Sequence, residues 1–339
     1  MRLLFCSNYP HLPDVIGGLQ TATDELCAAL LDRGVEPLVL CGRYEGSGTG
    51  PRHFDYKVVR AENPEATLPL IAATFEPTAI IVQNGFSLFP MVKAALATGR
   101  PTAIYMHNLE VSRLGGNLVA HPDLLYIANS PYTAARLEAL ADIQALVVPP
   151  AIQPQRYIVE ATGDRVLFVN PTLVKGFEIV FKLARRHPEI PFTIVESWSL
   201  DPAWRSYQKS RCADLPNIEW LDPVEDMRGL FAKARLLLMP SLWEEAYGRT
   251  VIEAQLNGLP VIASNRGALP DTVGEGGMIV DAHAPLDDWS HALGLLYHDP
   301  MAWQMLSAQA RDNARLAVMA GHLAIDRMLT RLASRQPPS

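Results

Sequence analysis

The segment Arg235 to Ser264, RLLLMPSLWEEAYGRTVIEAQLNGLPVIAS, constrains the fold more than any other part of the chain. Its apolar run Leu236 to Met239 is typical of a buried parallel strand. From Thr250 the apolar spacing favours a helix, and Pro260 to Ala263 restarts a strand. The segment therefore predicts a strand-helix-strand unit. Ligands bind outside the carboxyl ends of such strands, which is where Ser241 to Gly248 lies.

Short apolar runs recur along the whole chain, with helical patterns between most of them. They lie at Leu3 to Cys6, Pro37 to Cys41, Ala79 to Val82, Thr102 to Met106, Leu124 to Ala128, Leu146 to Val148, Arg165 to Val169, Phe192 to Val195 and Ile218 to Leu221. Strands that alternate with helices predict parallel, doubly wound α/β sheets. Helices are expected at Lys175 to Arg186, at Glu225 to Ala234 and from Pro285 to the C-terminus.

A proline-rich break, Pro149 to Pro154, predicts a stiff connection between two domains. We place them at residues 1–150 and 151–320, with 321–339 as a final helical segment. A chain of 339 residues with 49% hydrophobic content can bury two ordinary cores, which agrees with this division.

Charge and cysteine usage narrow the classes of protein. A formal charge of -7 without a Lys/Arg cluster argues against a nucleic-acid binder and against a strongly electrostatic membrane anchor, although peripheral membrane contact stays open. No apolar window is long enough for a signal peptide or a membrane span. The four cysteines lack metal-ligand spacing and are expected to be reduced thiols of a cytoplasmic protein: Cys6, Cys27, Cys41 and Cys212.

Two carboxylates belong to the strand-helix-strand unit. Glu245 lies in the ligand-side loop, close to Gly248, whose lack of a side chain lets backbone amides approach a ligand. A carboxylate there is a natural acceptor for sugar hydroxyls. Glu253 follows on the helix, and two interpretations remain open for it. It contacts a ligand, or it completes the capping box Thr250-x-x-Glu253.

Two features of the first domain point to the same edge of its sheet. Gly17-Gly18 follows the first strand and precedes a helix that starts near Leu19, so the pair suits phosphate, with simple turn chemistry as the alternative. His107 directly follows a strand, where a structural histidine is the alternative to a catalytic one.

The string PSLWEEAYGRTVIEAQLNGLPVIAS resembles the signature of the retaining nucleotide-sugar glycosyltransferases called family four. Their pattern is Glu-x-Phe-Gly, a second Glu eight residues after the first, Ala, and then Gly-x-Pro-Val-Ile. The matching positions are Glu245, Ala246, Tyr247, Gly248, Glu253, Ala254, Gly258, Pro260, Val261 and Ile262. Tyr247 replaces Phe, and Arg249 replaces an apolar residue.

The resemblance implies a GT-B fold, in which two Rossmann-like domains face a cleft and the last helix crosses back to the first domain. It implies retaining transfer of a sugar from a nucleoside diphosphate sugar to an acceptor, without a metal or cofactor. Arg43 to Asp55 is interpreted as an acceptor loop, and Glu196-Ser197-Trp198 stands where the family has a Gly-rich turn. The base, the sugar, the acceptor (glycan, lipid-linked or small molecule) and the oligomeric state stay undetermined.

The resemblance also implies the roles of particular residues. The catalytic residues are expected to be Glu245, Lys175 and His107. Donor-binding residues are expected at Gly17, Gly18, Asn170, Ala246, Tyr247, Gly248, Arg249, Thr250, Glu253, Arg266, Gly267 and Ala268. Among them, Lys175 and the amides of the glycine loops hold the diphosphate, and Glu253 accepts hydrogen bonds from ribose. Glu245 and His107 lie beside the donor sugar.

One departure from the family pattern bears on activity. Family members carry Arg-x4-Lys-Gly after the first strand of the second domain, whereas VNPTLVKGFEI has Asn170 at the Arg position. Loss of one preorganised donor costs roughly 10²- to 10³-fold in rate. Arg249 and Arg266 are candidates to compensate, with solvated surface arginines as the alternative. Ala268 replaces a family glycine, which is costly if that position needs a positive φ.

These observations leave two rival functions beside the transferase. One is a nucleotide-sugar epimerase on the same fold. The other is a non-catalytic relative that acts as a partner subunit.

Overall fold

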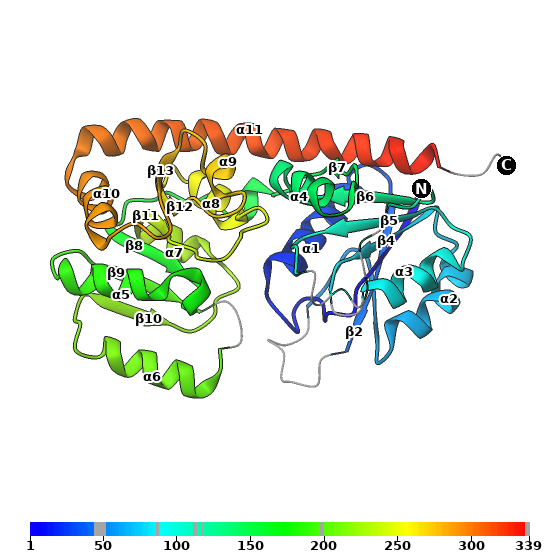
Figure 1. Cartoon of the computed structure of the whole chain (residues 1–339), viewed down its shortest axis with the longest axis horizontal. Coiled ribbons are helices and arrows are strands. Elements are labelled where there is room, and N and C mark those ends of the chain that lie inside the picture. The colour runs from blue at the N-terminus through cyan, green and yellow to red at the C-terminus, as the bar shows by residue number, and fades with distance from the viewer. Residues whose placement is uncertain are drawn as a thin grey trace. The chain divides into compact units, whose positions relative to one another are not determined.

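The computed structural model describes residues 1–43, 52–85, 88–110, 114, 116, 118, 120–196 and 200–335. Most of the predicted acceptor loop, 44–51, and Ser197-Trp198 lie outside these residues. The chain divides into two compact units. Unit 1 comprises Met1–Ile152 and Met319–Ser339, and unit 2 comprises Gln153–Val318 (Figure 1).

Unit 1 is built on a parallel sheet in the order β3-β2-β1-β4-β5-β6-β7. Its strands are β1 (Arg2–Cys6), β2 (Glu36–Gly42), β3 (Lys57–Ala61), β4 (Ala79–Gln83), β5 (Thr102–Met106), β6 (Leu124–Ala128) and β7 (Leu146–Val147). Its helices are α1 (Gly18–Leu31), α2 (Pro64–Phe75), α3 (Leu88–Leu96), α4 (Pro131–Ala141) and the C-terminal part of α11 (Pro300–Ala333).

Both faces of this sheet are covered, because successive residues of a strand point to opposite sides. In β1, Leu3 and Phe5 pack in one buried cluster with α1 and α11, whereas Leu4 and Cys6 pack in another with α2 and α3. The near-continuous apolar runs of the sequence follow from this double burial.

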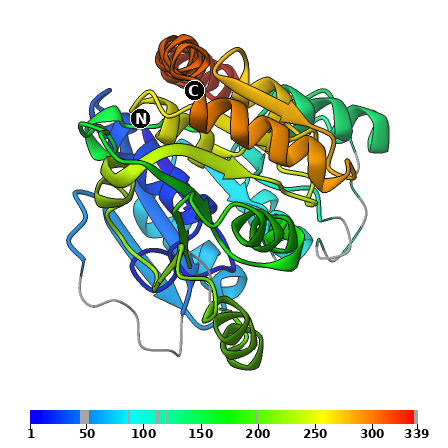
Figure 2. The same ribbon diagram turned by 90° about the vertical axis from the view of Figure 1, so that its left-hand side faces the viewer.

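Unit 2 repeats the design with the order β10-β9-β8-β11-β12-β13. Its strands are β8 (Arg165–Val169), β9 (Phe192–Val195), β10 (Ile218–Leu221), β11 (Ala234–Met239), β12 (Val261–Ser264) and β13 (Gly277–Val280). Its α-helices are α5 (Phe177–Arg186), α6 (Pro202–Cys212), α7 (Arg228–Lys233), α8 (Arg249–Gln255), α9 (Leu269–Val273) and α10 (Leu286–His298), before the first part of α11. Figure 2 looks onto this unit, where α5 (green) and α10 (orange) pack together around buried Trp289.

The expected doubly wound sheets are confirmed, and the differences are local. The sequence did not predict β3 and β13, which are half-exposed edge strands with apolar runs of only two and three residues. The predicted helix Lys175 to Arg186 starts only at Phe177, since Gly176 has a φ of +84° and breaks it from a short 3₁₀ turn. The helix predicted from Glu225 begins at Arg228.

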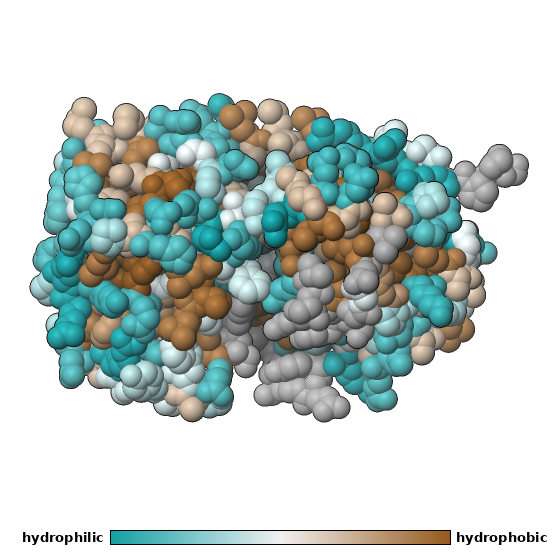
Figure 3. All heavy atoms as spheres, viewed as in Figure 1, coloured by the Kyte–Doolittle hydropathy of each residue, from teal (hydrophilic) through white to brown (hydrophobic). Residues whose placement is uncertain are grey.

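The cysteines, the helix lengths and the surface bear on the remaining general expectations. All four cysteines are buried and free of disulfides. No helix in the described part of the chain is long and apolar enough to cross a membrane. On the face drawn in Figure 3, hydrophilic residues (teal) interrupt the hydrophobic ones (brown).

Candidate functional site

The order of the strands in unit 2 places its ligand crevice. Chain connections leave β8 toward β9 on one side and return to β11 on the other. Ligands of doubly wound sheets bind outside the carboxyl ends of the strands at such a reversal. Here the crevice is formed by the loops 170–176 after β8 and 240–248 after β11.

These two loops are held together along their backbones. The amides of Leu242 and Trp243 donate to the carbonyl of Val174, at 2.8 and 2.9 Å. A Cβ atom added at Gly176 would lie 2.0 Å from the carbonyl oxygen of Pro240. The glycine after Lys175 is therefore required both by its positive φ and by this close approach.

The close approach brings two predicted catalytic residues into contact. Lys175 Nζ lies 2.5 Å from Glu245 Oε1, and the two side chains are only 12% and 9% exposed. Ser241, which is fully buried, donates from Oγ to the same carboxylate oxygen at 2.9 Å. Ser264 Oγ donates to the Ser241 carbonyl at 2.6 Å. An ammonium and a carboxylate thus share one buried site, with the carboxylate fixed by a serine that we did not predict.

Glu253 does not cap the helix α8, but pairs with an arginine of the same helix. The helix α8 begins at Arg249 with Gly248 as its N-cap, and no side chain caps it, so the capping-box alternative is wrong. Arg249 Nε instead donates to Glu253 Oε1 at 2.9 Å. The same guanidinium donates to the hydroxyl of Tyr157 at 2.8 Å. With its side chain only 10% exposed, Arg249 is also not a solvated surface arginine.

The loop after β12 packs on the backbone of the Glu245 loop. Gly267 has a φ of +62°, and a Cβ atom there would lie 2.2 Å from the carbonyl oxygen of Glu245. Ala268 has a φ of -81°, so the backbone strain that a positive φ would cause does not occur at this position. Its amide donates to the Glu245 carbonyl at 2.7 Å, which commits it to the protein rather than to a diphosphate. Arg266 forms an ion pair with Glu244, with side chains 33% and 47% exposed.

Asn170, at the family's Arg position, is 4% exposed and has a φ of +68°. Its backbone amide donates to the Val195 carbonyl at 2.8 Å, and its carbonyl accepts from the Thr172 amide at 2.7 Å. Within the part of the chain that the structure describes, its Oδ1 has no hydrogen-bond partner, and neither has the buried Oγ1 of Thr172. Two unsatisfied polar atoms therefore lie on the loop that carries Lys175.

The other predicted residues of this loop region shape its backbone. Gly248 has a φ of +84°, which a side chain would strain. The carbonyl of Tyr247 accepts a hydrogen bond from Thr272 Oγ1 at 2.5 Å, and burial raises the pKa of its phenol to about 12. Ala246 lies between Glu245 and Tyr247, and Thr250 is in the first turn of α8.

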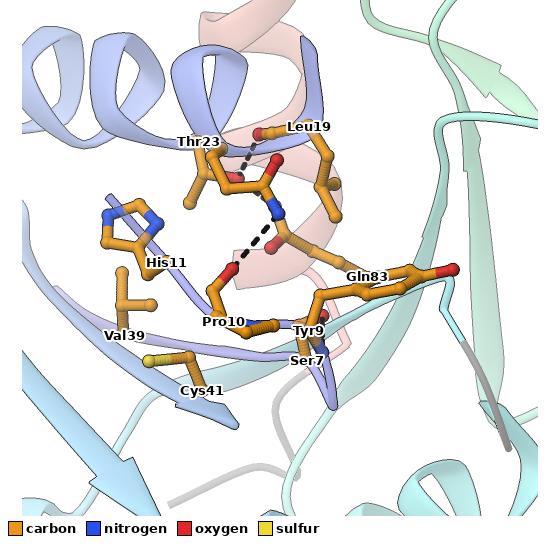
Figure 4. Close-up of a pocket in the computed structure, with 10 residues that line it drawn as sticks. Ser7, Tyr9, Pro10, His11, Leu19, Thr23, Val39, Cys41 and Gln83 are labelled. Atoms are coloured by element: carbon orange, nitrogen blue, oxygen red, sulfur yellow. Dashed lines mark hydrogen bonds between the residues drawn. The ribbon is translucent and has the colours of Figure 1, made fainter. Parts of the chain in front are cut away.

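In unit 1, Gly17 is the N-cap of α1 and Gly18 its first residue, without a side-chain cap. The loop before them borders a small, partly open cavity of about 10 Å³, lined by residues that include His11 and Thr23 (Figure 4). Such a volume holds about one water molecule. The cavity is therefore too small for a sugar, and neither Gly17 nor Gly18 lines it.

This loop is fixed by buried polar contacts. The Tyr56 hydroxyl donates to Asp24 Oδ1 at 2.7 Å and lies 2.8 Å from His11 Nε2. Arg60 Nε donates to Asp14 Oδ2 at 2.7 Å. Burial lowers the pKa of His11 to about 4, although the Asp24 carboxylate acts in the opposite direction. His11 is therefore neutral at physiological pH.

His107 directly follows β5 in unit 1, and asparagines from the two neighbouring strands hold its backbone. Its amide donates to Asn84 Oδ1 at 2.6 Å, and its carbonyl accepts from Asn129 Nδ2 at 3.2 Å. Neither asparagine was predicted as a site residue from the sequence. The available signal was that each directly follows an apolar run, as His107 does.

The predicted residues thus fall into two groups. The structure joins Lys175 with Glu245, Arg249 with Glu253, and the Gly267-Ala268 backbone with Glu245, all in unit 2. Gly17, Gly18 and His107 belong to unit 1. Among the described residues, no group of three or more His, Cys, Asp or Glu side chains is arranged to hold a metal ion.

Family models match both parts of the chain. The model described as Glycosyltransferase Family 4 matches residues 16–156, and that described as Glycosyl transferases group 1 matches residues 177–299.

Curated relatives align over shorter stretches. A D-inositol 3-phosphate glycosyltransferase of Corynebacterium kroppenstedtii is 36% identical over 94 residues, which cover 27% of this chain and 20% of the relative. The enzyme of the same name from an Arthrobacter species is 29% identical over 201 residues, covering 51% and 47%. The chain therefore spans about a fifth to a half of the length of these relatives.

Solved structures match over nearly the whole chain. Sucrose-phosphate synthase from Thermosynechococcus elongatus has a TM-score of 0.83 at 18% identity, covering 99% of this chain and all of that one. HepE from Anabaena, in complex with UDP and glucose, has a TM-score of 0.77 at 17% identity, covering 97% and 100%. At such identities the similarity establishes the GT-B fold alone. The two family models, which together match most of the chain, show that it belongs to the family 4 glycosyltransferases.

Proposed function

We propose that the chain transfers a sugar from a nucleoside diphosphate sugar to an acceptor, with retention of anomeric configuration and without a metal ion. The observation that carries this proposal is the contact of Lys175 with Glu245 at the ends of β8 and β11. It presents a cation and a carboxylate together at the crevice of a doubly wound sheet.

The two side chains suit the two halves of such a donor. Departure of the diphosphate concentrates negative charge, which the Lys175 ammonium stabilises from a preorganised position. The Glu245 carboxylate accepts hydrogen bonds from sugar hydroxyls, and Ser241 keeps it oriented. Glu253, oriented by Arg249, accepts from the ribose. Taken by itself, unit 1 also offers a favourable site for phosphate oxygens at the N-terminus of α1, near Gly17-Gly18, where no side chain caps the helix.

The missing family arginine at Asn170 is replaced by Arg266 rather than by Arg249. Moving Arg249 toward a diphosphate would break its buried ion pair with Glu253, and breaking such a pair costs about 3–5 kcal/mol. The Arg266–Glu244 pair is partly exposed, and such pairs contribute about 0–1 kcal/mol, so Arg266 can leave cheaply. Arg266→Ala is therefore expected to lower kcat by at least tenfold. An unchanged kcat in Arg266→Ala refutes this assignment.

The comparisons suggest where to look for substrates. HepE is described in complex with UDP-glucose, so a uridine diphosphate hexose is the first donor to test. The curated relatives are named for D-inositol 3-phosphate, which makes a phosphorylated polyol the first small-molecule acceptor, before glycans and lipid-linked sugars.

The test is a thermal-shift screen with nucleoside diphosphates and their sugars, followed by NMR of the products. A ligand at 100 times its Kd stabilises the fold by about 2.7 kcal/mol. A glycoside with the donor's anomeric configuration supports the proposal, and the opposite configuration overturns retention. An epimer formed from donor alone would identify the epimerase instead. Binding without turnover in any acceptor screen would favour the non-catalytic partner subunit. The absence of the family arginine at Asn170 is the feature that fits this alternative.

A further inference from the structure

We propose that Asn84 and Asn129 are positioning residues that act through His107. The proposal rests on the proposed function, for which the family resemblance implies that His107 is a catalytic residue. It concerns how this chain fixes that histidine, and neither asparagine was predicted as a site residue from the sequence.

The topology brings the three residues to one edge of the unit 1 sheet. The strands β4, β5 and β6 are adjacent and parallel, so their carboxyl ends meet. Asn84 directly follows β4, His107 follows β5, and Asn129 follows β6. The asparagines are 1% and 4% exposed, whereas His107 is only half-buried.

The side-chain amides of the two asparagines bond to the backbone amide and the backbone carbonyl of His107. Asn84 Oδ1 accepts from the His107 amide at 2.6 Å, while its Nδ2 donates to Asn108 O and Oδ1 at 3.1 and 2.8 Å. Asn129 Nδ2 donates to the His107 carbonyl at 3.2 Å, and its Oδ1 accepts from Thr133 Oγ1 at 2.9 Å. Each asparagine is thus bonded at both ends of its amide, which prevents it from turning.

The ring of His107 rests on a fixed platform. Tyr105 is two residues earlier and therefore on the same side of the extended chain. The two ring centroids are 4.2 Å apart with a tilt of 39°. Tyr105 is 2% exposed, and its hydroxyl donates to the Val148 carbonyl at 2.6 Å. Ring and backbone of His107 are therefore held by different neighbours, as a group that must meet a substrate in one geometry requires.

The sheet itself does not need these asparagine side chains. The register of β4 with β5 ends at the pair Gln83 and Tyr105. The backbone amides of Asn84 and Asn129 already continue the ladders, to Tyr105 O at 3.2 Å and Met106 O at 3.3 Å. Among the described residues, the side chains of Asn84 and Asn129 bond to His107, to Asn108 and, from Asn129, to Thr133.

The first test reads the histidine directly and needs no activity. With ¹³C-labelled histidine, the His107 ring resonance is assigned from its loss in His107→Ala. It is expected to shift or broaden in Asn84→Ala and Asn129→Ala. The control is Gln83→Ala, because Gln83 is equally buried on β4 but bonds Thr23 Oγ1, at 2.6 Å, instead of His107. A His107 resonance that moves no more in Asn84→Ala than in the control overturns the proposal.

The second test is a double-mutant cycle in kcat. Asn84→Ala is expected to lower kcat by about tenfold to a hundredfold, with the donor KM within about twofold of the parent, since misplacement by 1 Å can cost 10²-fold. In the His107→Ala background the same change is expected to cost nothing further. Equal losses in both backgrounds overturn the proposal. A chain that transfers no sugar at all would refute the proposed function, while the ring resonance still decides the positioning role.

Discussion

Replacing Lys175 leaves the buried carboxylate of Glu245 without the ammonium group that pairs with it. Lys175→Met keeps the length of the side chain but leaves Glu245, 9% exposed, without its cation. At 2.5 Å and an effective dielectric constant of 20, the gross attraction is about 7 kcal/mol, most of which offsets the desolvation of both groups. Loss of one partner from a buried pair costs about 3–5 kcal/mol, and that range is the expected decrease in free energy of unfolding.

The double variant Lys175→Met/Glu245→Gln tests this reasoning. It removes both charges, and Ser241 can still donate to the amide oxygen of the glutamine, so the expected cost falls to about 1 kcal/mol. The measurement is urea unfolding at pH 7, followed by far-UV circular dichroism and tryptophan fluorescence.

The matched control is Arg186→Met. Arg186 also lies 2.5 Å from its partner Asp287, but these side chains are 42% and 81% exposed, so the expected cost is below about 1 kcal/mol. A cost for Lys175→Met no greater than for Arg186→Met, or no recovery in the double variant, would refute the account of a buried, coupled pair.

Two further predictions concern neutral His11 and the tight loop at Gly267. Because burial lowers the His11 pKa from 6.5 to about 4, the unfolded chain binds the proton first as pH falls, so its contribution to stability drops by about 2 kcal/mol between pH 7 and pH 5. Urea unfolding at both pH values is expected to show this loss in the parent but not in His11→Gln. An equal change in the free energy of unfolding between pH 7 and pH 5 in both proteins would contradict it. Gly267→Ala places a Cβ atom against the Glu245 backbone, whereas Gly34→Ala, at a similar φ of +68°, meets nothing within 4 Å. The first is expected to cost at least about 2 kcal/mol more than the second in the same measurement, and equal costs would refute the packing argument.

The strands were the most predictable part of the fold. Thr102–Met106 and Phe192–Val195 have the predicted bounds, because parallel strands covered on both faces read as continuous apolar runs. The strands β3 and β13 give a weaker signal, because their apolar runs are only two and three residues long, Val58-Val59 and Met278 to Val280. Periodicity also could not locate the break before Phe177, which depends on a single glycine conformation.

The residue types of the candidate site were predictable, but their partners were not. Spacing singled out Glu253, yet Thr250-x-x-Glu253 is compatible with a capping box as well as with the observed pairing to Arg249. The contact of Lys175 with Glu245 joins residues 70 positions apart, and only the close packing of two loops creates it. The hold of Asn84 on His107 likewise depends on the order of the strands in the sheet.

The most direct test of the donor site in unit 2 is calorimetric titration of the chain with uridine, adenosine and guanosine diphosphate sugars. We predict saturable binding of one of them at a single site. The Kd is expected to rise at least tenfold in Lys175→Met and in Glu253→Ala, and to stay unchanged in Arg186→Met. No binding heat with any of these donors, or the same Kd in the Lys175 and Glu253 variants as in the parent, would contradict the assignment of this site.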